Sequence, residues 1–406
     1  MTLLIYSIQQ LPSKDIDMNL KTPLPLLGGI TAERFIKEYW QKKPLLIRQA
    51  IPGFECPVSA DELAGLALEE EIESRMVSKN GKSGHWEPKN GPFTEEDFAS
   101  MPKSNWTFLI QQLDAWVPEI NELRQQFNFI PNWRFDDVMA SYSVDGGSVG
   151  PHYDQYDVFI IQAEGKRHWR IGQQCDENSP QLEGTPLRIL SEFHESESWV
   201  LEAGDMLYIP PNIAHYGIAQ GESINLSIGY KAPTHTQILS HFTDYLLEHV
   251  NPYSIYEDAD LKPQDHPNEI TDTVFSKLNQ VLNQHTQNPE NLKRWFGEFN
   301  TSPKNESCIQ ALESSFTKED LEDLISQNVI ICRNEGSRFA YTKSGQSILF
   351  FVDGQSFELH ENNLNFVQTL CDTRGLSIKQ LLAGSNDSTI KQLVQDLLQN
   401  GNLYHD

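Results

Sequence analysis

The chain contains 406 residues, of which 38% are hydrophobic and 10% aromatic, so it is long enough for two or three domains and apolar enough to bury a core. This composition excludes a single small module, a collagen-like chain and a wholly disordered chain. Acidic residues outnumber basic ones by 57 to 31, and the net charge of -26 disfavours nonspecific binding to nucleic acid or anionic lipid and favours a basic macromolecular partner.

The cysteines and the first residues indicate the cellular compartment. The five cysteines form no Cys-x-x-Cys pair, which argues against a disulfide framework or a cysteine zinc site and favours a reducing cytoplasm. The apolar opening Met1–Tyr6 lacks the basic region and the length of a signal peptide, and no apolar run reaches the length of a membrane span. We therefore expect a soluble cytoplasmic protein with no membrane partner, with Met18 as a second possible start.

Residues 1–135 predict helical and strand elements that support a later β domain. Apolar residues at helical spacing followed by a β-rich run predict a helix leading into a strand over residues 31–49. Small polar residues before acidic ones predict helix starts near Asp61 and Thr94. The spacing of Leu109, Leu113, Trp116 and Ile120 predicts further helix between residues 106 and 132.

Residues 136–232 have the texture of a β-sandwich or barrel, with short β-branched and aromatic runs separated by Gly, Pro and Asn. Within this segment, an apolar run from Asp157 and a second run ending at Ile171 flank Glu164-Gly165. We expect a hairpin with its turn at Glu164-Gly165.

Residues 233–300 return to helical patterns, with one apolar stripe from Ile238 to Val250 and another from Val274 to Leu282. Two interpretations stay open at this point. The two helices either cover the barrel or form a dimer interface.

Residues 301–406 predict a separate small α+β domain. A helix near Phe316, a hairpin with its turn at Asp353-Gly354 and two later helices are typical of a winged helix. Winged helices often bind nucleic acid, but this segment has few basic residues, so we expect no direct nucleic-acid binding.

The clearest chemical signal is a set of two histidines and one aspartate. A glycine-rich approach precedes His152 and Asp154, which are two residues apart and would project to the same side of a strand. A Pro-Pro corner precedes His215, the natural third ligand. Two imidazoles and a carboxylate on one face of an octahedron suit Fe(II) that must also bind a co-substrate and dioxygen, while zinc is the competing metal.

A second signal lies on the strand after Gly165. Period-two alternation places Arg167 on the same face as Trp169 and Ile171, which predicts that Arg167 is buried. A buried guanidinium needs a carboxylate, supplied either by a dicarboxylic co-substrate such as 2-oxoglutarate or by a protein acid. Ser141 and Ser143 share a face of their strand and could donate hydrogen bonds to the same co-substrate.

These residues resemble a known family. The segment Gly146-x5-His152-x-Asp154 and the segment from Gly204 through Pro210 to His215 resemble the motifs of the Jumonji-C, cupin-fold 2-oxoglutarate oxygenases. Residues 149–162, residues 165–170, the run Leu207-Tyr208-Ile209-Pro210-Pro211 and the run Trp295–Phe299 are similar to the bacterial ribosomal oxygenases, which hydroxylate an arginine of a large-subunit ribosomal protein.

The resemblance implies an α+β fold with a double-stranded β-helix (jelly-roll) core over residues 136–232, a helical dimerisation region over residues 233–300 and a winged-helix-like domain over residues 301–406. It implies that His152, Asp154 and His215 hold Fe(II), that Arg167, Ser141 and Ser143 hold 2-oxoglutarate, and that Asn225 is a pocket residue. The implied activity is hydroxylation of an arginine in a large-subunit ribosomal protein by a homodimer. Hydroxylation of histidine, demethylation of another protein and a metal-binding cupin without oxygenase activity stay open as alternatives.

Overall fold

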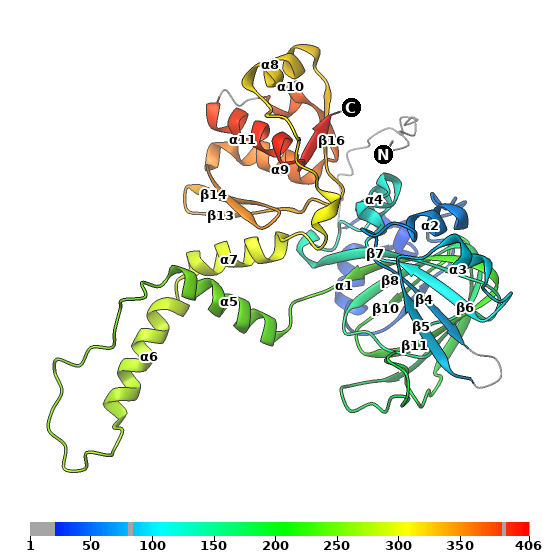
Figure 1. The fold of residues 1–406 in the computed structure, drawn as a ribbon, viewed down its shortest axis with the longest axis horizontal. Helices are drawn as coiled ribbons and strands as arrows, with labels where there is room; N and C mark the ends of the chain where they lie inside the picture. Colours follow the sequence, from blue (N-terminus) through cyan, green and yellow to red (C-terminus); the bar gives the residue numbers. More distant parts are fainter. Residues whose placement is uncertain (1–20, 80–83, 384–386, 406) are drawn as a thin grey trace.

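The computed structural model describes residues 21–79, 84–383 and 387–405. The possible start at Met18 therefore lies outside the described residues. Figure 1 shows a β-barrel with flanking helices, a helical arm that projects away from it, and a second domain that packs against the barrel and the base of the arm. Among the helices of the described ranges, none is both long and apolar enough to cross a membrane.

The N-terminal segment contributes both helices and strands to the barrel. Its elements are β1 (Pro23–Leu24), β2 (Ile30–Thr31), α1 (Ala32–Glu38), β3 (Leu45–Ile47), α2 (Ala60–Leu66), β4 (Ser74–Lys79), β5 (Trp86–Asn90), α3 (Glu95–Ala99), β6 (Trp106–Ile110) and α4 (Pro118–Gln125). The predicted helix starts are confirmed, because the Ser59 and Thr94 side chains accept hydrogen bonds at the first turns of α2 and α3.

The prediction of helix is wrong for the beginning of residues 106–132. All five residues of β6 are buried, and the strand pairs with β4 on one side and β7 on the other. A strand that is buried on both faces shows no period-two alternation, so its apolar residues fit the helical spacing of the segment that follows equally well.

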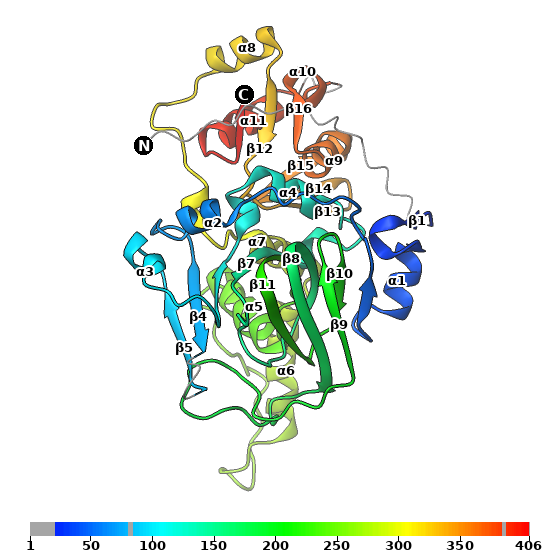
Figure 2. The same ribbon diagram turned by 90° about the vertical axis from the view of Figure 1, so that its right-hand side faces the viewer.

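The barrel is built on a nine-stranded sheet. Its remaining strands are β7 (Phe135–Ser143), β8 (Asp157–Gln174), β9 (Glu197–Glu202), β10 (Met206–Ile209) and β11 (Ile213–Tyr230). The order is β3-β10-β8-β11-β7-β6-β4-β5, with β9 paired to β8. Figure 2 shows these strands curling around one another. Since β3, β4, β5 and β6 come from the N-terminal segment, that segment is part of the barrel, and the division of the chain at residue 135 stays a proposal.

The predicted hairpin at Glu164-Gly165 is wrong. β8 continues through these residues as one long strand, paired antiparallel to β11 along its length. Gly165 has a φ of 66°, and the pairing shifts register between Ala219 and Ser223, opposite that glycine. A Cβ at Gly165 would lie 2.0 Å from the Glu222 carbonyl oxygen, so the glycine permits a close-packed irregularity in the strand and not a reversal.

The helical arm does not cover the barrel. It comprises α5 (His235–His249), α6 (Asp272–Thr286) and α7 (Pro289–Thr301). Tyr245 and Leu246 of α5 pack against Trp295 of α7, whereas α6 buries none of its residues and extends away from the rest of the molecule (Figure 1). The interpretation in which both helices cover the barrel is therefore wrong.

The C-terminal domain confirms the winged-helix prediction. Its elements are α8 (Lys318–Gln327), β12 (Ile330–Arg333), β13 (Phe339–Ser344), β14 (Ser347–Val352), β15 (Gln355–His360), α9 (Leu364–Asp372), β16 (Gly375–Ser377), α10 (Ile378–Leu381), α11 (Ser388–Gln399) and β17 (Leu403–His405). They enclose a hydrophobic core of their own. The hairpin turn falls at Asp353-Gly354 as predicted, and both residues have positive φ, as a type I′ turn requires. Short 3₁₀ helices complete the chain at Pro25–Leu27, Leu113–Ala115, Asn132–Arg134, Glu306–Cys308 and Glu361–Asn363.

Polar contacts join the winged helix to the barrel. Arg374 forms ion pairs with Glu122 of α4 and with Glu335 of its own domain. The Asn121 side chain donates to the Glu335 carbonyl at 3.3 Å, and the Arg338 guanidinium donates to the Asp136 carbonyl at 2.7 Å. Several polar and charged contacts thus connect the two domains, although Arg374 also has a carboxylate partner in its own domain.

Candidate metal centre and catalytic cavity

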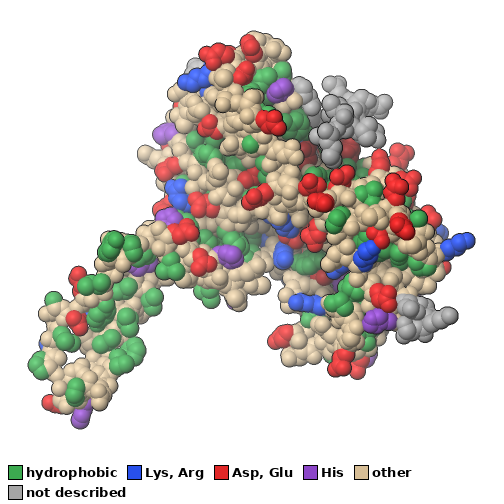
Figure 3. All heavy atoms as spheres, in the orientation of Figure 1, with side chains coloured by type: hydrophobic (Ala, Val, Ile, Leu, Met, Phe, Trp, Pro, Cys, Tyr) green, Lys and Arg blue, Asp and Glu red, His purple; other side chains and the backbone are tan. Residues whose placement is uncertain are grey.

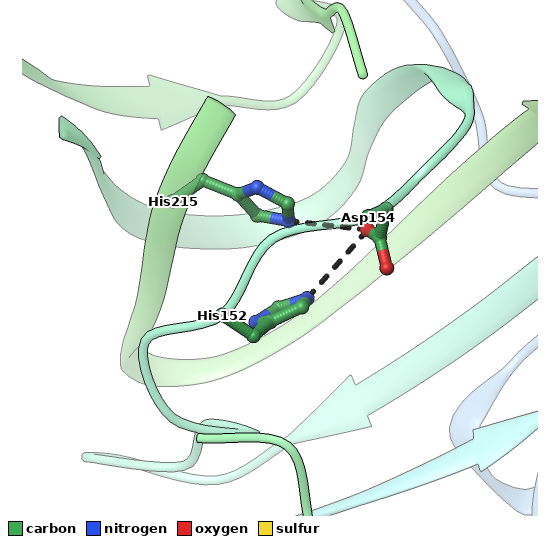
Figure 4. Close-up of side chains that lie close together, drawn as sticks. All are labelled: His152, Asp154 and His215. Carbon is green, nitrogen blue, oxygen red and sulfur yellow. Dashed lines mark ion pairs between the residues drawn. The ribbon is translucent and has the colours of Figure 1, made fainter. Parts of the chain in front are cut away.

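Two segments bring the three predicted ligands together. His152 lies between β7 and β8 and pairs with His215 of β11 through two backbone hydrogen bonds of 3.0 and 2.8 Å. His152 and Asp154 are therefore not part of a regular strand, contrary to the sequence-based expectation, because the glycine-rich approach ends β7 at Ser143. The Nε2 atoms of His152 and His215 nevertheless lie 3.7 and 3.4 Å from Asp154 Oδ2 (Figure 4).

Both imidazoles are held in the tautomer that a metal needs. Nδ1 of His152 lies 2.9 Å from the Gly150 carbonyl, and Nδ1 of His215 lies 2.9 Å from the Ile213 carbonyl. A carbonyl can only accept, so each Nδ1 carries the proton and each Nε2 directs a lone pair toward Asp154.

The protonation states also suit a cation. Burial, assisted by the neighbouring His215, lowers the pKa of His152 to about 4. Burial alone would raise the pKa of Asp154, but the adjacent imidazoles of His215 and His152 lower it to about 2. Near neutral pH the site therefore offers a neutral imidazole of His152 and a carboxylate as donors, and all three donor atoms lie within 4.8 Å of one another. This donor set fits Fe(II) with positions left open for other ligands.

A cavity of about 550 Å³ opens beside these ligands and includes Arg167 in its lining. The predicted burial of Arg167 is confirmed, since it is only 5% exposed. Its guanidinium donates to three hydroxyls, those of Ser141 at 3.1 Å, Ser143 at 2.6 Å and Ser223 at 3.1 Å. Burial lowers the pKa of Arg167 to about 9.

No carboxylate among the described residues forms an ion pair with Arg167, and its Nε has no hydrogen-bond partner there. The alternative in which a protein acid neutralises this arginine is therefore wrong. A buried cation surrounded by hydroxyls in an open cavity fits the distal carboxylate of a dicarboxylic acid such as 2-oxoglutarate.

The two remaining predicted residues lie behind the cavity wall. Ser143 is fully buried and also donates to Thr107 Oγ1 at 2.7 Å, so it holds Arg167 from behind. Asn225 pairs with Ser141 in the sheet and donates to Gln162 Oε1 at 2.9 Å, while its Oδ1 has no partner among the described residues. Neither residue is part of the cavity lining, so contact of Asn225 with a co-substrate stays a proposal.

Sequence reasoning missed a second acid in the cavity. Asp137 of β7 lines the same cavity as the metal ligands, and burial raises its pKa to about 6. Tyr156, which hydrogen-bonds to Asp154, and Arg75 were also missed. A signal for Asp137 was present, because extending the alternation of Ser143 and Ser141 back along the strand reaches Asp137.

Comparison with known proteins gives two family matches in one chain. Residues 122–238 match the model of the JmjC domain, and residues 282–404 match the model of the ROXA-like winged helix. The first match contains the metal ligands and Arg167, and the second contains all of α7 and the winged helix up to Tyr404.

Sequence relatives extend this result. The chain is 37% identical over 306 residues to the ribosomal protein uL16 3-hydroxylase of Escherichia coli (strain K12), covering 75% of this chain and 80% of that protein. It is 38% identical over 211 residues to a probable ribosomal oxygenase of Haemophilus influenzae, covering 52% of each chain.

Solved structures agree with the sequence relatives. The crystal structure of E. coli YcfD superposes with a TM-score of 0.84 at 32% identity, covering 92% of this chain and 98% of the other. A structure of YcfD, described as a ribosomal oxygenase in complex with cobalt and 2-oxoglutarate, gives a TM-score of 0.79 at 31% identity, again covering 92% and 98%.

Proposed function

The chain belongs to the ribosomal oxygenase family of Jumonji-C proteins, and on that premise we propose that it is an Fe(II)- and 2-oxoglutarate-dependent oxygenase that hydroxylates an arginine side chain of the large-subunit ribosomal protein uL16. The proposal rests chiefly on one observation. Arg167, a buried cation whose side-chain partners among the described residues are all hydroxyls, lies in the same cavity as a His-Asp-His metal site.

In this proposal His152, Asp154 and His215 hold Fe(II), and Arg167 binds the distal carboxylate of 2-oxoglutarate. Bound iron, with 2-oxoglutarate and dioxygen, supplies the oxidant for an unactivated C–H bond. The protein holds the groups in place. Ser141, Ser143 and Ser223 fix the guanidinium in one orientation, so it needs no reorganisation when the co-substrate arrives. Asn225, whose Oδ1 has no hydrogen-bond partner in the described ranges, is proposed to contact the same pocket.

Asp137 favours arginine over the alternative target residues. Its carboxyl shares the cavity with the metal ligands and forms no ion pair within the described ranges. A guanidinium would supply the missing cation and could bind a carboxylate through two hydrogen bonds. A neutral histidine would leave the carboxylate without a counter-ion. A methyl-lysine, the target of a demethylase, would supply the positive charge but could not form two parallel hydrogen bonds with the carboxylate. Asp137 therefore argues strongly against a histidine target and less strongly against a methyl-lysine target.

A ribosomal protein also suits the charge of this chain. The net charge of -26 attracts a basic partner over a distance and repels nucleic acid, so we propose that the enzyme acts in the cytoplasm on the protein and without direct contact with RNA or DNA.

We further propose that the chain forms a homodimer through α6. Phe275, Leu278 and Leu282 follow helical spacing along one face, and they are 57%, 43% and 62% exposed. Figure 3 shows hydrophobic side chains gathered on the arm. Such an apolar face on a projecting helix is typical of a subunit interface. Light scattering should give a dimer mass for the wild type and a monomer mass for Leu282→Asp, with Leu182→Asp, at an exposed position outside the arm, as the control. A monomeric wild type would refute this part.

Mass spectrometry tests the activity directly. Purified protein is incubated with uL16, Fe(II), 2-oxoglutarate and oxygen, and we expect a gain of one oxygen on an arginine. His152→Ala should abolish this gain, while His194→Ala, at an exposed histidine outside the cavity, should retain it. Turnover of 2-oxoglutarate without a mass change would reject uL16 as the substrate and keep the oxygenase, and an oxygen on histidine would reject the choice of target residue.

A further inference from the structure

We propose that the winged-helix side of the molecule positions the cavity acid Asp137, through Lys304 and Arg338, which hold the adjacent residue Asp136. This inference rests on the proposed function, since it assigns Asp137 to binding the target side chain. Lys304 and Arg338 are positioning residues in this proposal, because neither of them lines the catalytic cavity.

Asp136 and Asp137 lie near the start of β7, where the pairing with β11 is interrupted by a register shift. β7 pairs with β11 at Ile228↔Val138 and at Tyr230↔Phe135, so the two aspartates lie opposite the single residue Gly229. This is the geometry of a β-bulge, in which an extra residue is left without ladder partners and a side chain is redirected. On its other side, β7 pairs with β6 only from Ala140 onward.

The bulge separates two cavities. Asp137 lines the catalytic cavity and also a smaller cavity of about 70 Å³ between the barrel and the winged helix. Asp136 lines only the smaller cavity. Asp137 Oδ2 accepts a hydrogen bond from the Gln112 backbone at 3.2 Å, which leaves Oδ1 close to Gly229, at the wall of the catalytic cavity.

Besides the Gln112 amide, two further partners that hold this bulge come from beyond the barrel. Lys304, in the segment after α7, forms an ion pair with the Asp136 carboxylate. Arg338, which precedes β13 of the winged helix, donates from Nη2 to the Asp136 carbonyl at 2.7 Å. One contact holds the side chain and the other holds the backbone of the same residue. Together they hold Asp136 at a position where the ladder between β7 and β11 is interrupted.

The consequence for activity is specific. Losing these contacts lets the bulge relax and moves the Asp137 carboxylate away from the target side chain, whereas the metal ligands and Arg167 stand on other segments. A misplaced binding residue weakens productive binding of the ligand that it contacts and leaves the binding of other ligands unchanged. The protein substrate should therefore be affected and 2-oxoglutarate should not.

Steady-state kinetics of full-length Lys304→Met and Arg338→Met test this inference. We expect the KM for uL16 to rise roughly tenfold in each variant, while the KM for 2-oxoglutarate and the rate of uL16-independent 2-oxoglutarate turnover stay within about twofold of wild type. Lys304→Arg, which keeps the charge, should restore the KM for uL16. The matched control is Arg374→Met, which removes a charged contact between the same two domains that does not touch Asp136.

Three results would overturn the inference: an unchanged KM for uL16 in both variants, an equal rise in Arg374→Met, or a parallel rise in the KM for 2-oxoglutarate. If the wild type leaves uL16 unmodified, the proposed function fails, and a substrate-independent measurement then decides about positioning. The Gln112 N–H donates to Asp137 Oδ2, so amide hydrogen exchange at Gln112 should be faster in Lys304→Met and in Arg338→Met than in wild type, and unchanged in Arg374→Met. Exchange at the wild-type rate in both variants would refute the positioning role.

Discussion

Two arginines in different regions of the molecule are satisfied in different ways. Arg374, at the contact between the barrel and the winged helix, forms ion pairs with Glu122 and Glu335. Arg167, in the catalytic cavity, bonds only to hydroxyls within the part of the chain that the structure describes. Burial alone would lower the pKa of Arg374, but the effect of the Glu335 carboxylate is larger and opposite, so the pKa is raised. The pKa of Arg167 is lowered, because burial acts there without an opposing carboxylate among the described residues.

This difference separates a structural charge from a binding charge. An arginine that serves only stability has its counter-ions in the chain, because a buried charge without one is costly. An arginine that must bind an anion cannot be neutralised in advance, since the internal carboxylate would compete with the ligand. Hydroxyls solve the problem by orienting the guanidinium without cancelling its charge.

The largest effect is expected from removing the binding charge. Arg167→Met should raise the KM for 2-oxoglutarate by on the order of 10²-fold or more, because the ligand carboxylate loses its charged partner in a buried site. Thermal unfolding without ligand should be unchanged or shifted upward, since an unpaired buried cation is removed. Thermal shift assays should also show that 2-oxoglutarate stabilises the wild type and not the variant.

Arg167→Lys is the matched test of geometry. A lysine keeps the charge but cannot reproduce the planar fork that donates to the three serines, so it should not restore the KM for 2-oxoglutarate. Wild-type binding of 2-oxoglutarate by Arg167→Lys would show that charge alone suffices. A large loss of stability in Arg167→Met would show that Arg167 serves mainly to stabilise the fold.

The opposite result is expected for the structural charge. Arg374→Met should lower the free energy of unfolding by about 1–3 kcal/mol, less than for a fully buried pair because Glu122 is partly exposed. Urea denaturation measures this loss, and the KM for 2-oxoglutarate should stay within about twofold of wild type. A variant that is as stable as wild type but binds 2-oxoglutarate poorly would contradict the distinction between the two arginines.

The catalytic cavity can be predicted from the sequence better than the contact between the two domains. The motifs around His152-x-Asp154 and before His215 predict the metal ligands, and the alternation through Trp169 predicts the burial of Arg167, because each of these patterns is local. The Glu164-Gly165 hairpin was predicted wrongly since a glycine with positive φ serves a turn and a strand irregularity equally well, and only the pairing with β11 decides between them. The pair of Arg374 and Glu122 joins residues 252 positions apart, and no pattern in the sequence connects them.

The smallest expected effect is the pH dependence that Asp137 gives to the reaction with uL16. It extends the comparison of paired and unpaired charges from arginines to an acid. Burial holds its pKa near 6, with Lys304 opposing the rise and Asp136 and Asp114 adding to it. The carboxylate form, which binds a guanidinium, dominates above this value and is lost as the pH falls below it. We therefore expect kcat/KM for uL16 to fall about tenfold from pH 7 to pH 5.

Two controls isolate this titration from other groups. Turnover of 2-oxoglutarate without uL16, measured over the same pH range, reports on the metal site and Arg167, and it should vary much less than kcat/KM for uL16. Asp137→Asn should have low activity toward uL16 and no dependence on pH beyond that of the substrate-independent reaction, because an amide does not titrate in this range. If Asp137→Asn keeps the wild-type profile, another group controls the pH dependence, and the contrast between paired and unpaired charges then applies to the arginines alone.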